Sequence, residues 1–138
     1  MSVRYILDAC AIIALLKDEA GSEEVSTIFN DAFKGETLIS MNKINLLEVY
    51  YDVYRSAGKE TADNVLFELS KRPITVVPEI SDSVFAEAGR LKATYKISLA
   101  DSIALAEASV SGGSLVTADH HEFDSIEKHE SIRFHWIR

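Results

Sequence analysis

Short apolar runs and longer amphipathic segments alternate along the chain. The runs Val3–Leu7, Thr37–Ser40, Ile74–Val77 and Ser114–Thr117 are rich in aliphatic or β-branched residues and are bounded by polar or turn-forming residues. Runs of this kind predict buried strands. Ile132–Ile137 predicts a further strand at the edge of the sheet, and we expect it to follow a short acidic turn.

Between these runs, apolar residues recur every three or four positions, which is the period of an amphipathic helix. Asn42, Ser81 and Ser98 are residues that cap the starts of helices, and Gly58 and Gly112 are residues that end them. The predicted helices cover residues 10–17, 21–33, 42–57, 60–71, 81–95 and 98–110.

Strands that are separated by helices predict parallel pairing through right-handed crossovers. We therefore expect an α/β fold, a three-layer α/β/α sandwich with a mostly parallel central sheet of four to five strands. The 138 residues include only two prolines and six glycines, and no stretch has the composition of a linker. We expect residues 1–138 to form a single domain.

The sequence predicts a cytoplasmic protein that does not enter a membrane. Its longest uncharged apolar run, Ala9–Leu16, is far shorter than the roughly 20 residues of a membrane span. This run follows Asp8 rather than a basic segment, so it does not resemble a signal peptide. The single cysteine, Cys10, excludes an internal disulfide.

Acidic residues outnumber basic ones by 22 to 14, which gives a net charge of -8. A field of this sign repels nucleic acid. Any function on nucleic acid therefore requires a local basic patch or a bound cation. Candidate phosphate contacts are the cluster Arg90, Lys92 and Lys96 and, on another helix, Lys43.

Two acidic residues follow predicted strands, where sites in parallel sheets form. Asp8 comes directly after the first strand, and Asp119 comes two residues after the fourth. Each also has a simpler interpretation. Asp8 can cap the helix that follows, and Asp119 can be an ordinary loop residue.

Asp101 lies in the first turn of a predicted helix, three residues after Ser98. A capping box places an acid there without any further role. However, no lysine or arginine occurs between Lys96 and Lys128, although acids are frequent in that segment. Acids without cationic neighbours either stay in water or share a bound cation.

Glu48 lies within the helix that Asn42 starts. A helical wheel places Glu48 with Asn45, Asp52 and Arg55 on a polar side that we expect to face solvent, and it does not distinguish Glu48 from Asp52. The predicted apolar stripe of this helix consists of Leu46, Leu47, Tyr50, Val53 and Tyr54.

Several carboxylates that converge on one cleft repel one another unless a divalent ion binds them. Hard oxygen ligands favour Mg²⁺ or Mn²⁺, and a carboxylate-held Mg²⁺ commonly acts on phosphate esters. The adjacent His120 and His121 do not indicate a zinc site, because successive residues on a turn seldom point at one ion.

Four segments, taken together and in this order, resemble the PIN-domain family and, more narrowly, its VapC-type toxin ribonucleases. The segments are Val3–Asp8, Asn45–Tyr51, Ile97–Ala106 and Leu115–Phe123. The resemblance implies an Mg²⁺-dependent endoribonuclease that is the toxin of a toxin–antitoxin pair. It also implies an RNA substrate, a homodimer and a cognate antitoxin that blocks the acidic cleft.

Carried onto this chain, the family's acidic quartet is Asp8, Glu48, Asp101 and Asp119, with Thr117 as a polar helper. The resemblance thus selects Glu48 over Asp52. Relatives differ over the acid near the last site strand, so Glu122 can replace or assist Asp119.

One departure from the family pattern lies beside the first aspartate. Relatives usually carry a serine, threonine or asparagine within two residues of it, whereas Ala9 and Cys10 follow Asp8 here. A hydroxyl hydrogen bond to the substrate or the carboxylate is therefore expected to be missing. Cys10 itself is expected to be a small buried residue rather than a nucleophile.

Two functions of other classes remain open from the residues. A phosphoacceptor signalling domain is also acidic, α/β and Mg²⁺-binding, but it would place a lysine after a late strand, and none follows Thr117. A catalytically silent binding module of the same fold would neither bind Mn²⁺ nor cleave RNA.

Overall fold

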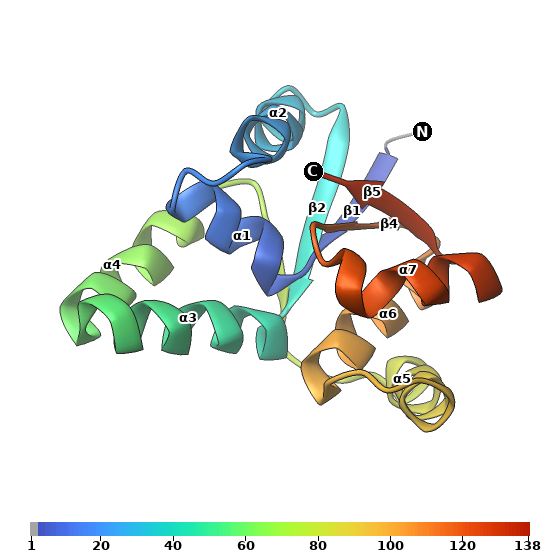
Figure 1. The fold of residues 1–138 in the computed structure, drawn as a ribbon. Coiled ribbons are helices and arrows are strands. Elements are labelled where there is room, and N and C mark those ends of the chain that lie inside the picture. Colours follow the sequence, from blue (N-terminus) through green and yellow to red (C-terminus); the bar gives the residue numbers. More distant parts are fainter. Residues whose placement is uncertain (1–2) are drawn as a thin grey trace.

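The computed structural model describes residues 3–138 and contains a five-stranded sheet in which each neighbouring pair is parallel (Figure 1). The strand order is β3-β2-β1-β4-β5, so β1 is central and β5 is at an edge, as the sequence predicts for the last strand. The strands are β1 Val3–Leu7, β2 Thr37–Asn42, β3 Thr75–Val77, β4 Ser114–Thr117 and β5 Arg133–Trp136.

Helices connect the strands and cover both faces of the sheet (Figure 1). The helices are α1 Ala9–Leu16, α2 Ser22–Phe33, α3 Lys43–Ala57, α4 Lys59–Ser70, α5 Asp82–Thr94, α6 Leu99–Ser111 and α7 His120–His129. Asn42, Ser81 and Ser98 cap α3, α5 and α6 through their side chains, as predicted. The three-layer α/β/α fold with a parallel central sheet is confirmed.

The period of two along the strands divides the core between the two faces of the sheet. Leu7 packs with α1, α2 and α3 in one cluster of buried side chains, which includes Ile12, Phe29 and Val49. The preceding residue, Ile6, packs in the other cluster, with side chains from α5, α6 and α7. Because the end of β1, at Ile6 and Leu7, is buried on both faces, it is fixed relative to the helices on either side.

The segment before β5 is a helix, so the expected short acidic turn is wrong. Asp119 caps α7 by accepting a hydrogen bond from the Glu122 backbone N–H at 3.1 Å. Only Phe123 and Ile126 of this helix are buried. Two apolar anchors among acidic and basic residues gave too little periodic signal for a helix to be predicted.

The face of α3 that points inward also differs from the prediction. Asn45, Val49 and Val53 are buried, whereas the side chains of Leu47 and Tyr54 are about half exposed. The predicted polar side therefore contains a fully buried residue, Asn45. A wheel drawn from one helix does not include its neighbours, and here α3 packs on the first turn of α6 through a polar contact.

Within the part of the chain that the structure describes, no helix has the length and apolar character needed to cross a membrane.

Candidate active site

Two central strands end beside one another, and each delivers an aspartate to the same edge of the sheet. β1 and β4 are paired in parallel, with Leu7 opposite Val116. Asp8 continues this pairing, because its backbone N–H donates to the Val116 carbonyl at 3.4 Å. Asp119 follows the neighbouring strand by two residues, so both acids lie at the carboxyl ends of the central strands.

Asp8 caps a helix and is also buried within the acidic group. Its Oδ1 accepts a hydrogen bond from the Ala11 N–H at 3.0 Å, which begins α1, and the residue is only 3% exposed. Burial raises the pKa of Asp8 to about 7, against the opposing effect of hydrogen bonds from Thr117 and Ala11. The negative charges of Asp101 and Asp119 raise it further. Helix capping and membership of an acidic cluster are thus both features of Asp8.

Thr117 links the two aspartates that follow the strands. Its fully buried side chain hydrogen-bonds the Asp8 carboxyl group. The Thr117 hydroxyl oxygen also accepts a hydrogen bond from the Asp119 N–H at 3.1 Å. A hydroxyl contact to Asp8 therefore comes from β4, although Ala9 and Cys10 carry none. No hydroxyl follows Asp8 within two residues, and the effect of this departure on the substrate stays a prediction.

Asp101 joins the group from α6. The Ser98 hydroxyl caps this helix by accepting from the Asp101 N–H at 3.0 Å, as a capping box predicts. Burial raises the pKa of Asp101 to about 6, and a hydrogen bond from Ser98 opposes this shift. The charges of Glu48, Asp119 and Glu122 then add to the rise. Negative charges on α3 and at the start of α7 therefore raise the pKa of the acid on α6.

The structure separates Glu48 from Asp52, which the helical wheel could not do. Glu48 is half-buried, and its pKa is raised by burial, against a hydrogen bond from Asn45. Asp52 lies one turn further along α3 and forms ion pairs with Lys17 at 3.0 Å and Arg55 at 3.3 Å. The charge of Glu48 contributes to the raised pKa of Asp101, whereas Asp52 is paired with basic side chains.

Glu122 lies close to the quartet without being one of the residues that end a strand. Its backbone N–H is the one that Asp119 caps, and its charge contributes to the raised pKa of Asp101. This position in the first turn of α7 keeps Glu122 beside Asp119 as an additional carboxylate.

The chemistry of these donors fits a hard divalent cation. Within residues 3–138, none of Asp8, Glu48, Asp101 and Asp119 forms an ion pair with a basic side chain. Across the same range, no three His, Cys, Asp or Glu side chains already stand close enough to form a ready metal-binding group. Carboxylates whose charges raise the pKa values of Asp8 and Asp101 gain from a shared cation, and oxygen donors suit Mg²⁺ or Mn²⁺.

His120 and Cys10 also have side chains that could react, but neither is needed to explain the acidic site. His120 hydrogen-bonds Asp124 at 2.7 Å and the Arg138 carbonyl at 2.8 Å, and its ring stacks on Trp136. Burial raises the pKa of the Cys10 thiol to about 11, which makes it a poor nucleophile. These contacts account for His120 without a role in the site, and the raised thiol pKa argues against Cys10 as a nucleophile.

Arg90, one of the candidate phosphate contacts, is held by two carboxylates. Its guanidinium pairs with Glu87 and with Glu130, each at 2.7 Å. An arginine in such a network is already neutralised, so the structure does not favour Arg90 as a contact for RNA.

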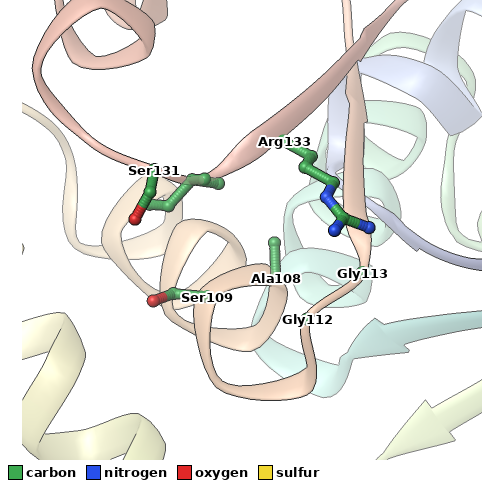
Figure 2. Close-up of a pocket in the computed structure, with 7 residues that line it drawn as sticks. Ala108, Ser109, Gly112, Gly113, Ser131 and Arg133 are labelled. Atoms are coloured by element: carbon green, nitrogen blue, oxygen red, sulfur yellow. The ribbon is translucent and has the colours of Figure 1, made fainter.

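A small cavity of about 150 Å³ lies at the opposite end of the sheet from the acids (Figure 2). It lies between the end of α6, at Gly112 and Gly113, and the start of β5, where Arg133 and Ser131 lie. Figure 2 shows the Arg133 guanidinium near Gly113 and the Ser131 hydroxyl pointing elsewhere. Its polar groups do not converge, and it contains none of the acids described above.

Comparisons with known proteins agree with this architecture. The chain is similar in structure to VapBC2 from Rickettsia felis, described as bound to a DNA fragment from their promoter, with a TM-score of 0.76, 19% identity and coverage of 96% of this chain and 98% of that chain. VapBC-1 from nontypeable Haemophilus influenzae gives a TM-score of 0.73, 20% identity and coverage of 98% of each chain. VapC20 from Mycobacterium tuberculosis, described as a sarcin–ricin loop cleaving toxin, gives a TM-score of 0.66 at 12% identity, covering 88% of this chain and 94% of that chain.

These similarities in structure, at low identity, show a shared fold. A search of curated proteins by sequence found no match. A scan against family models matches the PIN domain over residues 5–129, which is most of the chain. This chain therefore belongs to the PIN domain family.

Proposed function

We propose that the chain is an endoribonuclease dependent on Mg²⁺ or Mn²⁺ and that it is the toxin of a toxin–antitoxin pair. The observation that carries the proposal is the mutual effect of the acids at the carboxyl ends of β1 and β4. Asp8 and Asp101 have raised pKa values there, and Glu48 and Asp119 contribute to the same field without any basic partner within residues 3–138. Such a group is suited to a cation and, through it, to a phosphodiester.

In this proposal, Asp8, Asp101 and Asp119 hold the metal, directly or through water, and Glu48 orients the attacking water. When bound, Mg²⁺ would supply a Lewis acid that lowers the pKa of a water and offsets charge on the phosphate oxygens. The Thr117 hydroxyl holds the Asp8 carboxyl group in place, and Ser98 fixes the start of α6, where Asp101 lies. Attack by water is expected to leave a 5′-phosphate and a 3′-hydroxyl.

The relatives described above support the proposed partners. Two of them are described as VapBC2 and VapBC-1, and a further similar structure is described as a toxin–antitoxin complex from Klebsiella pneumoniae. We therefore propose a cognate antitoxin for this chain and, from the family, a homodimer. We also propose that the chain acts on RNA in the cytoplasm.

Cleavage of a defined RNA by the purified chain tests the proposal. With Mg²⁺ or Mn²⁺ we expect cleavage that EDTA abolishes and that Asp101→Asn and Glu48→Gln reduce by at least about 100-fold, because each removes a charge from the reacting site. Asp52→Asn is the matched control on α3, and we expect it to retain activity because Asp52 faces Lys17 and Arg55.

Three outcomes would contradict the proposal. Products that end in 2′,3′-cyclic phosphate would show attack by the ribose rather than by water. Correctly folded protein that neither binds Mn²⁺ nor cleaves RNA would instead indicate a silent binding module, and incorporation of phosphate from acetyl phosphate would indicate a phosphoacceptor domain.

A further inference from the structure

Asn45 is a fully buried amide on α3, one turn before Glu48. The neighbouring buried positions of this helix are Val49 and Val53. An asparagine in such a position loses its hydration, and each of its polar atoms needs a partner to offset that loss. The contacts of its side chain therefore indicate what this residue does.

The amide nitrogen of Asn45 connects two helices that carry acids of the proposed site. Nδ2 donates a hydrogen bond to the Ala100 carbonyl at 3.0 Å, and Ala100 immediately precedes Asp101 on α6. The same side chain lies close enough to Glu48, one turn along α3, to oppose the rise in the pKa of its carboxyl group. An amide nitrogen has two hydrogens, which match these two acceptors.

The other polar atom of Asn45 gains nothing from its position. Oδ1 is buried and has no hydrogen-bond partner among the residues that the structure describes. A buried acceptor without a partner lowers stability, and a leucine of similar size would avoid that cost. The hydrogen bond to Ala100 and the interaction with Glu48, rather than packing, therefore explain an asparagine at this position.

We propose that Asn45 is a positioning residue that fixes Glu48 on α3 relative to Asp101 on α6. This inference rests on the proposed function, because the two acids matter as parts of one site. Glu48 and Asp101 carry like charges and would separate if they were free to move. An NH₂ group that donates to the backbone beside Asp101 and acts on the Glu48 carboxylate holds the two elements at a constant spacing. Asn45 does not contact the substrate in this scheme.

The first test measures the coupling in metal-free protein by NMR. Relative to the wild-type protein, Glu48→Gln is expected to shift the resonance of one side-chain N–H proton of Asn45. Asn45→Leu is expected to shift the resonance of the Asp101 backbone amide. Asp52→Asn, one turn beyond Glu48, should leave the Asn45 side-chain signals in place. Unchanged Asn45 signals in Glu48→Gln would overturn the proposal, and this variant does not require Asn45→Leu to fold.

The second test measures Mn²⁺ affinity by calorimetry and RNA cleavage with Asn45→Leu. We expect a loss of roughly 10- to 100-fold in Mn²⁺ affinity or in kcat, with little change in KM, as for residues that orient metal ligands. The matched control is Val49→Ala, which removes buried side-chain atoms from the same face of α3 without removing a polar contact. It should lower the melting temperature but leave Mn²⁺ affinity and kcat within about 2-fold, as a change of packing alone would.

The results separate this inference from the proposed function. Wild-type affinity and kcat in Asn45→Leu, or an equal loss in Val49→Ala, would refute a positioning role for Asn45. If wild-type protein neither binds Mn²⁺ nor cleaves RNA, the proposed function fails, and the NMR arm still decides whether Asn45 joins Glu48 to Asp101.

Discussion

Asp8 ends the central strand and begins the next helix with one carboxyl group. One oxygen accepts from the Ala11 N–H, and Thr117 hydrogen-bonds the same group. These contacts do not offset the cost of burial, because the pKa of Asp8 remains raised to about 7. The residue therefore lowers the stability of the metal-free protein near neutral pH, as expected for a group kept for binding rather than for folding.

Replacement of Asp8 by asparagine is expected to stabilise the metal-free protein and abolish RNA cleavage. The amide keeps an acceptor for the Ala11 N–H but carries no charge. At pH 7.5 we expect a gain of about 2 to 4 kcal/mol in the free energy of unfolding, since each pKa unit is worth about 1.4 kcal/mol. Denaturant unfolding in EDTA measures it. Asp31→Asn, on α2, is the control and should leave stability unchanged. A loss of stability in Asp8→Asn would contradict the raised pKa of Asp8.

Stability of the metal-free protein is expected to fall as the pH rises from about 5 to 7. The pKa values of Asp8 and Asp101 are raised to about 7 and about 6, so the folded state holds more protons than the unfolded chain in this range. The raised pKa of His120 acts in the same direction. Unfolding curves in EDTA at several pH values test this, and a double variant Asp8→Asn/Asp101→Asn should have a flatter profile. A wild-type profile that rises through this range would refute it.

At the scale of elements, Asp119 shows why capping and site roles need separate tests. It caps α7 through the Glu122 N–H and also adds its charge to the field at Asp8 and Asp101. Asparagine is a good N-cap residue, whereas alanine is not. Substitution of Asp119 by asparagine and by alanine therefore separates the loss of its charge from the loss of the helix cap.

Asp119→Asn is expected to weaken Mn²⁺ binding without loss of stability, whereas Asp119→Ala should also cost about 1 kcal/mol of stability through loss of the helix cap. Calorimetric titration with Mn²⁺ and thermal unfolding measure the two effects. Glu122→Gln serves as the comparison for the alternative acid. If Glu122→Gln weakens binding and Asp119→Asn does not, Glu122 takes the place of Asp119.

The elements that could be predicted are those whose burial repeats with a regular period. β1 and α6 have enough apolar residues for their positions and ends to follow from the sequence, and the order of strands and helices predicted the parallel sheet. α7 has only Phe123 and Ile126 to mark its buried side, so it was missed. A pattern of apolar residues does not detect a helix that is held mainly by its cap.

The acids that end strands could be located from the sequence, but those on α3 could not. Asp8 and Asp119 follow from the rule that sites form at the carboxyl ends of parallel strands. Glu48 was selected only by the family resemblance, because the side of α3 that faces inward depends on its contact with α6. Asn45 was missed for the same reason: its polar character predicted exposure, although it is buried against Ala100.

At the scale of the whole molecule, the net charge of -8 comes from 22 acids against 14 bases, and some of the acids pair with basic side chains. Glu87 and Glu130 pair with Arg90, which lowers the pKa of both carboxyl groups. This network connects α5 to the residue after α7, and Tyr95 donates to Glu130 as well, at 2.6 Å. The acids at the ends of β1 and β4 have no such partner within residues 3–138.

Arg90→Met is expected to destabilise the protein by about 1 kcal/mol and to leave RNA cleavage unchanged, because its partners are partly exposed and solvent screens such pairs. The loss should become smaller at high salt. Thermal unfolding at two salt concentrations, with cleavage measured below the transition, tests both parts. A variant of full stability that loses RNA affinity would restore Arg90 as a phosphate contact.

The most direct measurement of the central claim is the position of a bound cation in a crystal of the protein soaked in Mn²⁺, located from anomalous scattering at the manganese edge. We predict a peak within coordination distance of carboxylate oxygens of Asp8 and Asp101, with Asp119 reaching it directly or through water. We also predict no such peak in Asp8→Asn crystals treated in the same way. A peak at any other group of residues, or none in the wild-type protein, would contradict a shared metal site at the ends of β1 and β4.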